Sequence, residues 1–182
     1  MADPRTDGFF RGRVLHRLLE LLPACDEDKR PQTAERLLAR LAPETPDKTR
    51  AIWRDEVLSV LNDPAFAPVF LPVGRAEVSV AGNISVNGQT YKISGQIDRL
   101  IQHQDEVLIV DYKTNRPPPL RLEETPQAYL AQMGAYAALV RRALPGLIVK
   151  SALLWTYAPK LIALPDDLID GAFHKSLRAH EG

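Results

Sequence analysis

The sequence predicts an α/β sandwich with a mixed central sheet. Apolar residues recur at the helical spacing between residues 14 and 61. From Arg75 onward the spacing changes to two, which is the period of a half-buried strand. A helical pattern and a further strand then follow these strands, so the elements form an αβββαβ core with extra N-terminal helices. Elements in this order stack helices on the faces of a sheet.

The N-terminal third predicts helices separated by prolines. Residues 1–12 are polar, and we expect them to form a flexible lead-in. Three amphipathic helices are predicted, over Val14–Leu22, Thr33–Leu41 and Lys48–Leu61. Asp47 suits the N-cap of the third helix. Asn62–Pro72 carries internal prolines, so we expect a loop there.

The middle of the chain predicts strands that pair as a meander. They cover Arg75–Val80, Thr90–Gln102 and Val107–Lys113. Asn87-Gly88 is a two-residue hairpin signal, because both turn positions need a positive φ. The continuous apolar run over 107–110 predicts a central strand that is buried on both faces.

The last third alternates helix and strand. Asn115–Glu124 contains three consecutive prolines and is expected to be a loop. Thr125 is a good N-cap and Pro126 a good first residue for a helix that ends near Ala143. The remaining predicted elements are strands over Leu147–Tyr157 and Leu161–Leu164 and a helix over Pro165–Arg178.

Length and composition favour one globular domain. With 182 residues, 45% of them hydrophobic and 25% charged, we expect a single domain over 1–182. It would consist of a helical part over 13–62 and a core with the catalytic sheet over 74–180. No apolar run reaches the roughly 20 residues of a membrane span. The N-terminus lacks the basic-then-apolar order of a signal peptide, so we expect a cytoplasmic protein.

Cysteine content and charge narrow the function classes. Cys25 is the only cysteine, which excludes an intrachain disulfide, a cysteine zinc site and an iron–sulfur cluster held by this chain alone. The 23 basic and 23 acidic residues give a net charge of zero, whereas proteins that bind DNA autonomously are usually basic on one face. The chain also lacks a phosphate-loop motif, which excludes a nucleotide-hydrolysing motor of that kind. This balance fits a nuclease to which a partner delivers the substrate.

Asp98, Asp111 and Lys113 are the candidate catalytic residues. Asp-Tyr-Lys alone is typical of a solvated charge pair at a strand end. Asp98, however, lies on the strand that a tight turn pairs with the strand of Asp111, so the two carboxylates are expected to lie within a few ångströms. Ionised carboxylates at that range need a cation, and Mg²⁺ prefers oxygen ligands. Lys113 lies on the same strand face as Asp111 and can offset charge on a phosphate.

These residues lie in segments that resemble a known family. GRVLHRLLELLP, GQIDRL, VLIVDYKTN and QMGAY resemble, in this order, the PD-(D/E)XK nucleases of the RecB-like branch. In particular they resemble the C-terminal nuclease domain of AddA helicase–nuclease subunits. The resemblance runs from Gly12 to Leu168 and implies a restriction-endonuclease-like three-layer sandwich with extra N-terminal helices. Ile97 stands where the family name has a proline.

The resemblance also implies roles for individual residues. Three side chains and one backbone carbonyl would bind the metal, namely those of His16, Asp98 and Asp111 and the carbonyl of Tyr112. Lys113 would be the catalytic lysine, and Gln132 and Tyr136 would be the family's Gln-x-x-x-Tyr pair. The implied cofactor is Mg²⁺, for which Mn²⁺ can substitute. The implied partners are DNA, mainly single-stranded, a helicase motor domain and a second subunit of a double-strand-break repair and recombination complex.

Each of these residues also has a structural alternative. A lone histidine such as His16 is more often a surface residue than a ligand, and Glu20, one turn on, suits a salt bridge. Gln132 and Tyr136 share a helix face and suit packing as well as contact with DNA. Glu77 suits either a second-metal carboxylate or a surface acid, and Arg99 and Arg116 suit either phosphate contacts or surface cations. Trp53 and Trp155 are better interpreted as core residues than as base-stacking platforms.

The leading hypothesis is a Mg²⁺-dependent exonuclease-type deoxyribonuclease domain that leaves 5′-phosphate and 3′-hydroxyl ends, as the resemblance implies. Two alternatives remain open. A non-catalytic module with the nuclease fold would bind a partner or guide a DNA strand, and the neutral charge allows this. A restriction-type endonuclease would cut duplex DNA at specific sequences, but the sequence contains no dedicated base-reading element.

Overall fold

The computed structural model describes residues 4–179, with side chains from residue 8 onward, and shows two compact units built from interleaved segments. The first unit contains the chain up to Pro72 together with residues 112–118 and 154–160. The second contains residues 73–111, 119–153 and the chain from Leu161. The expectation of a single domain stays a prediction.

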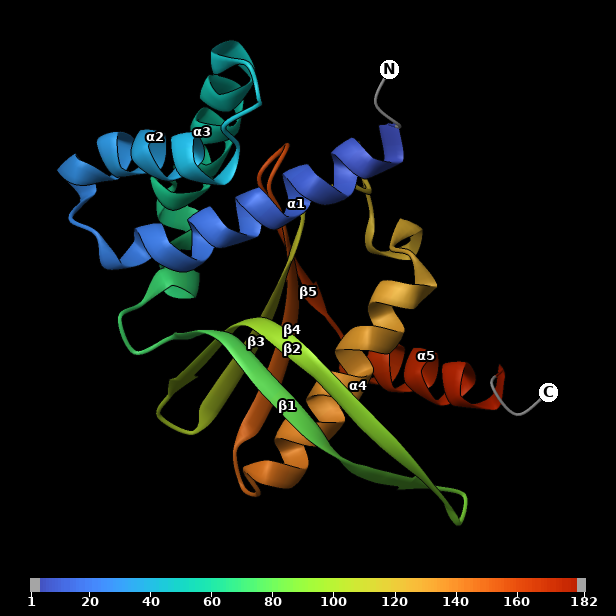
Figure 1. Ribbon diagram of the computed structural model, residues 1–182. Helices are drawn as coiled ribbons and strands as arrows, with labels where there is room; N and C mark the ends of the chain where they lie inside the picture. The colour runs from blue at the N-terminus through green and yellow to red at the C-terminus, as the bar shows by residue number, and fades with distance from the viewer. Residues whose placement is uncertain (1–3, 180–182) are drawn as a thin grey trace. The chain divides into compact units, whose positions relative to one another are not determined.

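The first unit is mainly helical (Figure 1). It contains α1 (Pro4–Leu21), α2 (Arg30–Leu41) and α3 (Asp47–Leu61), with short 3-10 helices over Leu22–Ala24 and Glu27–Lys29. Residues 4–12 were expected to be a lead-in, and that prediction is wrong because α1 already begins at Pro4. The early start has a packing reason, since the ring of Phe10 meets the ring of Trp53 edge-on at 6.2 Å between centroids. Residues 1–3 lie outside the described residues.

Other helix boundaries in this unit also differ from the prediction. α2 begins at Arg30 rather than Thr33, because a proline such as Pro31 is tolerated in the first helical turn. The N-cap of α3 is Pro46 rather than Asp47, and Asp47 lies in the first turn, where it binds Arg50. The expected loop over 62–72 contains a 3-10 helix, Pro64–Phe70, which the Asp63 side chain caps by accepting from Ala65 N at 2.9 Å.

The sheet has five strands in the order β1-β2-β3-β4-β5. They are β1 (Arg75–Val86), β2 (Gln89–His103), β3 (Glu106–Lys113), β4 (Ile148–Trp155) and β5 (Lys160–Leu164). β1 to β3 form an antiparallel meander, and α4 connects β3 to its neighbour β4. The predicted α/β class with a mixed sheet is confirmed. The Asn87-Gly88 turn is also confirmed, with φ values of 51° and 81°, and β1 extends to it instead of ending at Val80.

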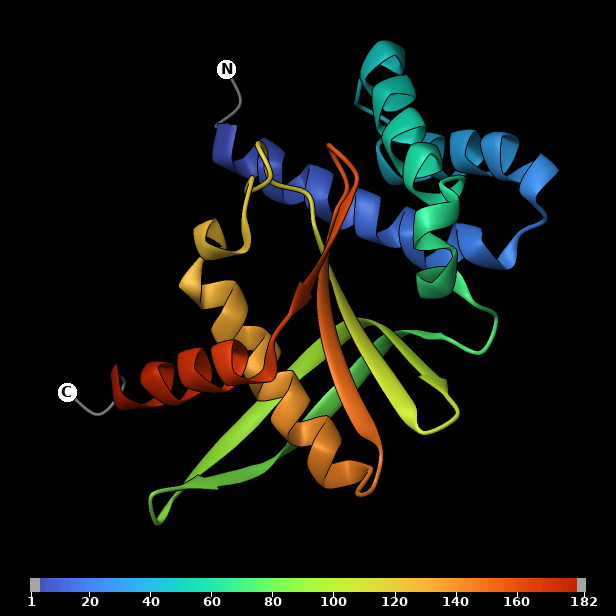
Figure 2. The same cartoon turned by 180° about the vertical axis from the view of Figure 1, so that it is seen from behind.

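Two helices cover the sheet in the second unit, α4 (Gln127–Ala143) and α5 (Asp166–Ala179), and they lie against each other (Figure 2). Gly134 permits this contact, because a Cβ there would lie 2.2 Å from the Ile169 carbonyl oxygen. Pro126, rather than Thr125, is the N-cap of α4. A 3-10 turn, Leu122–Glu124, precedes it. The outer parts of β1 and β2 pack against α4 and α5 through an apolar cluster: Ile84, Val86, Tyr91, Ile93, Ala135, Phe173 and Leu177.

Trp53 and Trp155 are both buried, as the sequence predicts for core residues. Among residues 4–179, no helix combines the length and apolar character needed to cross a membrane.

Candidate active site

Glu77 and Asp98 face each other across strands β1 and β2. In the antiparallel register Ala76 pairs with Arg99 and Val78 pairs with Ile97, so Glu77 and Asp98 lie between these two pairs. Their carboxylate oxygens lie within 4.8 Å of each other. Glu77 has a φ of 53°, in the left-handed region that a glutamate rarely adopts. Backbone strain of this kind clusters at functional sites, where the surrounding structure maintains it.

Asp111 continues this line of acids on β3. Val110 pairs with Arg99, and extending the register by one residue places Asp111 opposite Asp98. Asp98 and Asp111 are 8% and 4% exposed, respectively. The sequence predicts that the carboxylates of these two aspartates lie within a few ångströms of each other, and that distance stays a prediction. We call Glu77, Asp98 and Asp111 the acid row.

Tyr112 and Lys113 end strand β3 directly after the acid row. Lys113 is two residues from Asp111, so both side chains leave the strand on the same face. The Lys113 carbonyl accepts from Thr156 N at 3.0 Å. Tyr112 is buried, and its ring stacks on Phe70 with 6.3 Å between centroids.

His16 lies on α1 in the first unit and is half-buried. Its ring meets the ring of Tyr112 edge-on, with 5.7 Å between centroids. The predicted histidine therefore lies beside the residue that follows Asp111 in the chain. Glu20 forms an ion pair with Arg17 on the same helix, as its salt-bridge alternative predicted. The role of His16 as a metal ligand stays a prediction.

Tyr136 on α4 contacts the start of the strand segment that carries Asp98. Its hydroxyl accepts from Gln132 Nε2 at 3.1 Å and from the backbone N–H of Gln96 at 3.4 Å. Gly95 is required under the ring, because a Cβ there would lie 2.5 Å from Tyr136 Cε1. Tyr136 is buried, which agrees with its packing alternative, and a contact of this pair with DNA stays a prediction.

The two candidate phosphate-binding arginines differ in their surroundings. Arg99 is only 5% exposed, so its interpretation as a surface cation is wrong. It lies on β2, where it pairs with Ala76 of β1 on one side and with Val110 of β3 on the other. Arg116 is half-exposed, and its Nη2 lies 2.6 Å from Glu56 Oε2. A role in phosphate binding stays a prediction for both residues.

Glu56 on α3 is a buried acid that the sequence interpretation missed. Arg11 Nη2 donates to both of its carboxylate oxygens at 2.6 Å, and Thr156 Oγ1 donates to Oε1 at 2.5 Å. With Arg116, these residues form what we call the Glu56 cluster, and all four belong to the first unit. A signal was present in the sequence, because position 56 falls within the helical spacing of buried residues on α3: Trp53, Val57 and Val60.

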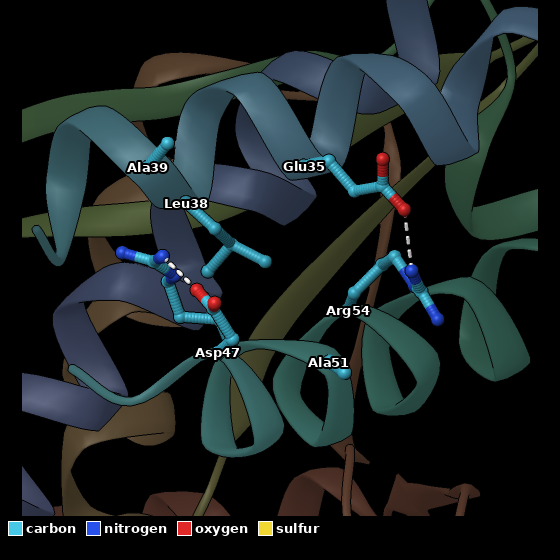
Figure 3. Close-up of a pocket in the computed structure, with 7 residues that line it drawn as sticks. Glu35, Leu38, Ala39, Asp47, Ala51 and Arg54 are labelled. Atoms are coloured by element: carbon cyan, nitrogen blue, oxygen red, sulfur yellow. Dashed lines mark hydrogen bonds and ion pairs between the residues drawn. The ribbon is translucent and has the colours of Figure 1, made fainter.

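A separate cavity of about 310 Å³ lies between α2 and α3 (Figure 3). Leu38, Ala39 and Ala51 contribute apolar surface, and the ion pairs Asp47–Arg50 and Glu35–Arg54 also line it. Hydrogen bonds to Asp55 and Glu35 raise the pKa of the Arg54 guanidinium. Because these charges already pair with each other, the cavity presents no catalytic constellation.

Comparison with known proteins shows the family to which the chain belongs. Residues 2–164 match the PD-(D/E)XK nuclease superfamily, and the chain belongs to that superfamily. The fold is accordingly restriction-endonuclease-like. A curated relative, an ATP-dependent helicase/nuclease subunit from Pelotomaculum thermopropionicum (strain DSM 13744 / JCM 10971 / SI), is 36% identical over 74 residues. That match covers 41% of this chain and 6% of the relative's length.

Among solved structures, the crystal structure of SSO0001 aligns over 96% of this chain and 86% of that one. The sequence identity is 15% and the TM-score is 0.41.

The acid row fits a hard divalent cation. Carboxylate oxygens are the ligands that Mg²⁺ and Mn²⁺ accept, and a row of acids on adjacent strands concentrates negative charge in one place. Two of the three acids are buried, where an ionised carboxylate is stable only beside compensating charge or donors. The residues present therefore match the divalent metals usual for this superfamily.

Proposed function

We propose that this chain is a Mg²⁺-dependent deoxyribonuclease domain that hydrolyses phosphodiester bonds, mainly of single-stranded DNA. The observation that carries the proposal is the acid row, which ends two residues before Lys113 on the same strand. Membership of the nuclease superfamily supports a role for these residues in phosphodiester hydrolysis. We further propose that the domain acts as an exonuclease in the cytoplasm.

Asp98 and Asp111 would hold the metal, together with the backbone carbonyl of Tyr112 and, by family likeness, His16. When bound, Mg²⁺ neutralises charge on the scissile phosphate and makes nearby water more acidic. Glu77 faces Asp98, so its carboxylate adds an oxygen ligand or orients a water molecule. The Lys113 ammonium would offset the charge that develops on the phosphoryl oxygens and hold the attacking water by a hydrogen bond.

We also propose that the domain works with a helicase motor and a second subunit in double-strand-break repair. The support is its 36% identity over 74 residues to a helicase/nuclease subunit. The formal net charge of zero adds to this support, because a domain without an overall positive charge gains most from a partner that delivers the strand.

The test uses purified chain with labelled single- and double-stranded DNA in Mg²⁺, Mn²⁺ or EDTA. We expect cleavage of single strands with either metal, none in EDTA, and a loss of at least about 10²-fold in rate for Lys113→Ala. Lys113→Ala with normal circular dichroism and unchanged cleavage would refute the mechanism. If the wild-type chain does not cleave DNA and neither metal changes its thermal midpoint, a non-catalytic module is favoured.

A further inference from the structure

The Glu56 cluster holds more positive than negative charge. The guanidinium groups of Arg11 and Arg116 share the single carboxylate of Glu56, and Thr156 adds a neutral hydroxyl. Arg11 has a structural role, because its Nη1 also donates to the carbonyl of Thr114 at 2.6 Å. Arg116 differs, since its side chain is 39% exposed. Its five N–H groups form a planar fork that suits phosphate oxygens, and Glu56 engages only one edge of it.

Tyr157 presents an aromatic ring beside this guanidinium. Arg116 Cζ lies 4.1 Å from the centroid of the Tyr157 ring, which is cation–π geometry. The tyrosine is 51% exposed, although its neighbours Trp155 and Thr156 are fully buried. A half-exposed aromatic ring beside a cation combines the two features, stacking surface and positive charge, by which proteins bind single-stranded nucleic acid.

The Glu56 cluster is connected to the candidate catalytic lysine through the backbone. Thr156 N donates to the carbonyl of Lys113, and Thr156 Oγ1 donates to Glu56. Tyr157 follows Thr156 directly, so both Tyr157 and Arg116 are tied to the segment that leaves β3 at Lys113. A nucleotide bound there would be a near neighbour of the phosphate at Lys113.

We propose that Arg116 and Tyr157 form a binding site for one nucleotide of a single DNA strand, next to the scissile phosphate. Arg116 binds the phosphate and Tyr157 stacks on the base, while Glu56 fixes the direction of the guanidinium. This inference rests on the proposed nuclease function, since it assigns the site a strand of DNA. It also explains how a chain without net charge can retain affinity for that strand, because binding depends on local cations.

The contribution of the ring is tested by binding alone. The 182-residue chain with Lys113→Ala is titrated in EDTA into a fluorescent oligothymidylate of about 10 nucleotides, and anisotropy gives Kd. Adding Tyr157→Ala should raise Kd by about tenfold, whereas Tyr157→Phe should restore binding to within about twofold of the parent. On an abasic oligonucleotide, Tyr157→Ala should change nothing. Equal affinity of the Ala variant and the parent for oligothymidylate would overturn the site.

The contribution of Arg116 is tested by salt dependence. Each phosphate contact on a single strand adds about 0.7 to the slope of log Kd against log salt, so Arg116→Ala should reduce the slope by that amount, with or without bases. Arg121→Ala is the matched control, because Arg121 is an exposed arginine paired with Glu124 and lies outside the site. A slope unchanged by Arg116→Ala, or lowered equally by Arg121→Ala, contradicts the proposal.

These measurements separate the site from the nuclease proposal. The parent lacks Lys113 and the buffer lacks metal, so an inactive wild-type enzyme would not alter the binding result. If wild-type cleaves DNA but the Arg116 and Tyr157 variants bind normally, only the nucleotide site is refuted. If the parent chain shows no measurable binding at low salt, the site is also refuted. Thermal midpoints within a few degrees of the parent establish that the variants are folded.

Discussion

The acid row and the Glu56 cluster place carboxylates in opposite charge arrangements. In the acid row, Glu77, Asp98 and Asp111 lie on three adjacent strands, and the carboxylate oxygens of Glu77 and Asp98 lie within 4.8 Å of each other. In the Glu56 cluster, one acid lies between two guanidinium groups. The first arrangement concentrates negative charge, which suits a divalent cation, whereas the second places two guanidinium groups around one carboxylate and has a net positive charge.

The largest effect is expected from a substitution that disrupts the acid row. Asp98→Asn keeps the shape of the side chain and removes its charge, so metal-dependent cleavage should fall by about 10³-fold. Without metal, the unfolding free energy should stay the same or rise by up to about 1 kcal/mol, because repulsion between neighbouring carboxylates is relieved. Single-turnover cleavage and chemical denaturation in EDTA measure the two quantities.

Metal-dependent stabilisation provides the control for this variant. Saturating Mn²⁺ should raise the thermal midpoint of the wild-type chain and raise that of Asp98→Asn much less, since a ligand stabilises only the state that binds it. A variant that loses about 3 kcal/mol of stability in EDTA would show that Asp98 is structural, and the contrast with Glu56 would disappear.

The next largest effect is expected from disrupting the Glu56 cluster, which should lower stability, whereas Asp98→Asn should not. Glu56→Ala leaves two guanidinium groups without their shared carboxylate, so the unfolding free energy should fall by about 3 kcal/mol. Most of that loss belongs to Arg11, because Arg116 is more than one-third exposed and water screens it. Denaturation of Glu56→Ala and of Glu56→Ala/Arg11→Met should show partial recovery in the double variant. A Glu56→Ala chain as stable as wild type would mean that the cluster has no structural role.

The same two groups show what sequence alone can predict. The antiparallel pairing of the strands that carry Asp98 and Asp111 was predictable, because a tight turn fixes the register of adjacent strands and Val110 pairs with Arg99. The Glu56 cluster was not, since its partners Arg11, Arg116 and Thr156 lie 45, 60 and 100 residues away in the sequence. No local period encodes contacts of that range.

The backbone conformation of Glu77 and the role of Gly95 could not be predicted from the sequence for a different reason. The positive φ of Glu77 contradicts the local preference of a glutamate, so the sequence cannot indicate it. The glycine at position 95 had no local explanation either, and its reason is the Tyr136 ring on the helix that packs over β2. In both cases tertiary packing overrides local propensity near the acid row.

The smallest expected effect tests whether the acid row is held at a cost in stability. Glu77→Gly and Glu77→Ala remove the same carboxylate, so their difference isolates the backbone at a φ of 53°. The left-handed region costs an L-residue other than glycine roughly 1–2 kcal/mol of conformational free energy. Glu77→Gly should therefore be more stable than Glu77→Ala by about 1 kcal/mol. Urea denaturation of both variants in EDTA measures this difference. If alanine proves equally stable, the chain relaxes at position 77, and the conformation of Glu77 is not maintained by the rest of the sheet. If glycine is more stable, the fold keeps a strained glutamate opposite Asp98, which is expected only where the carboxylate itself is needed.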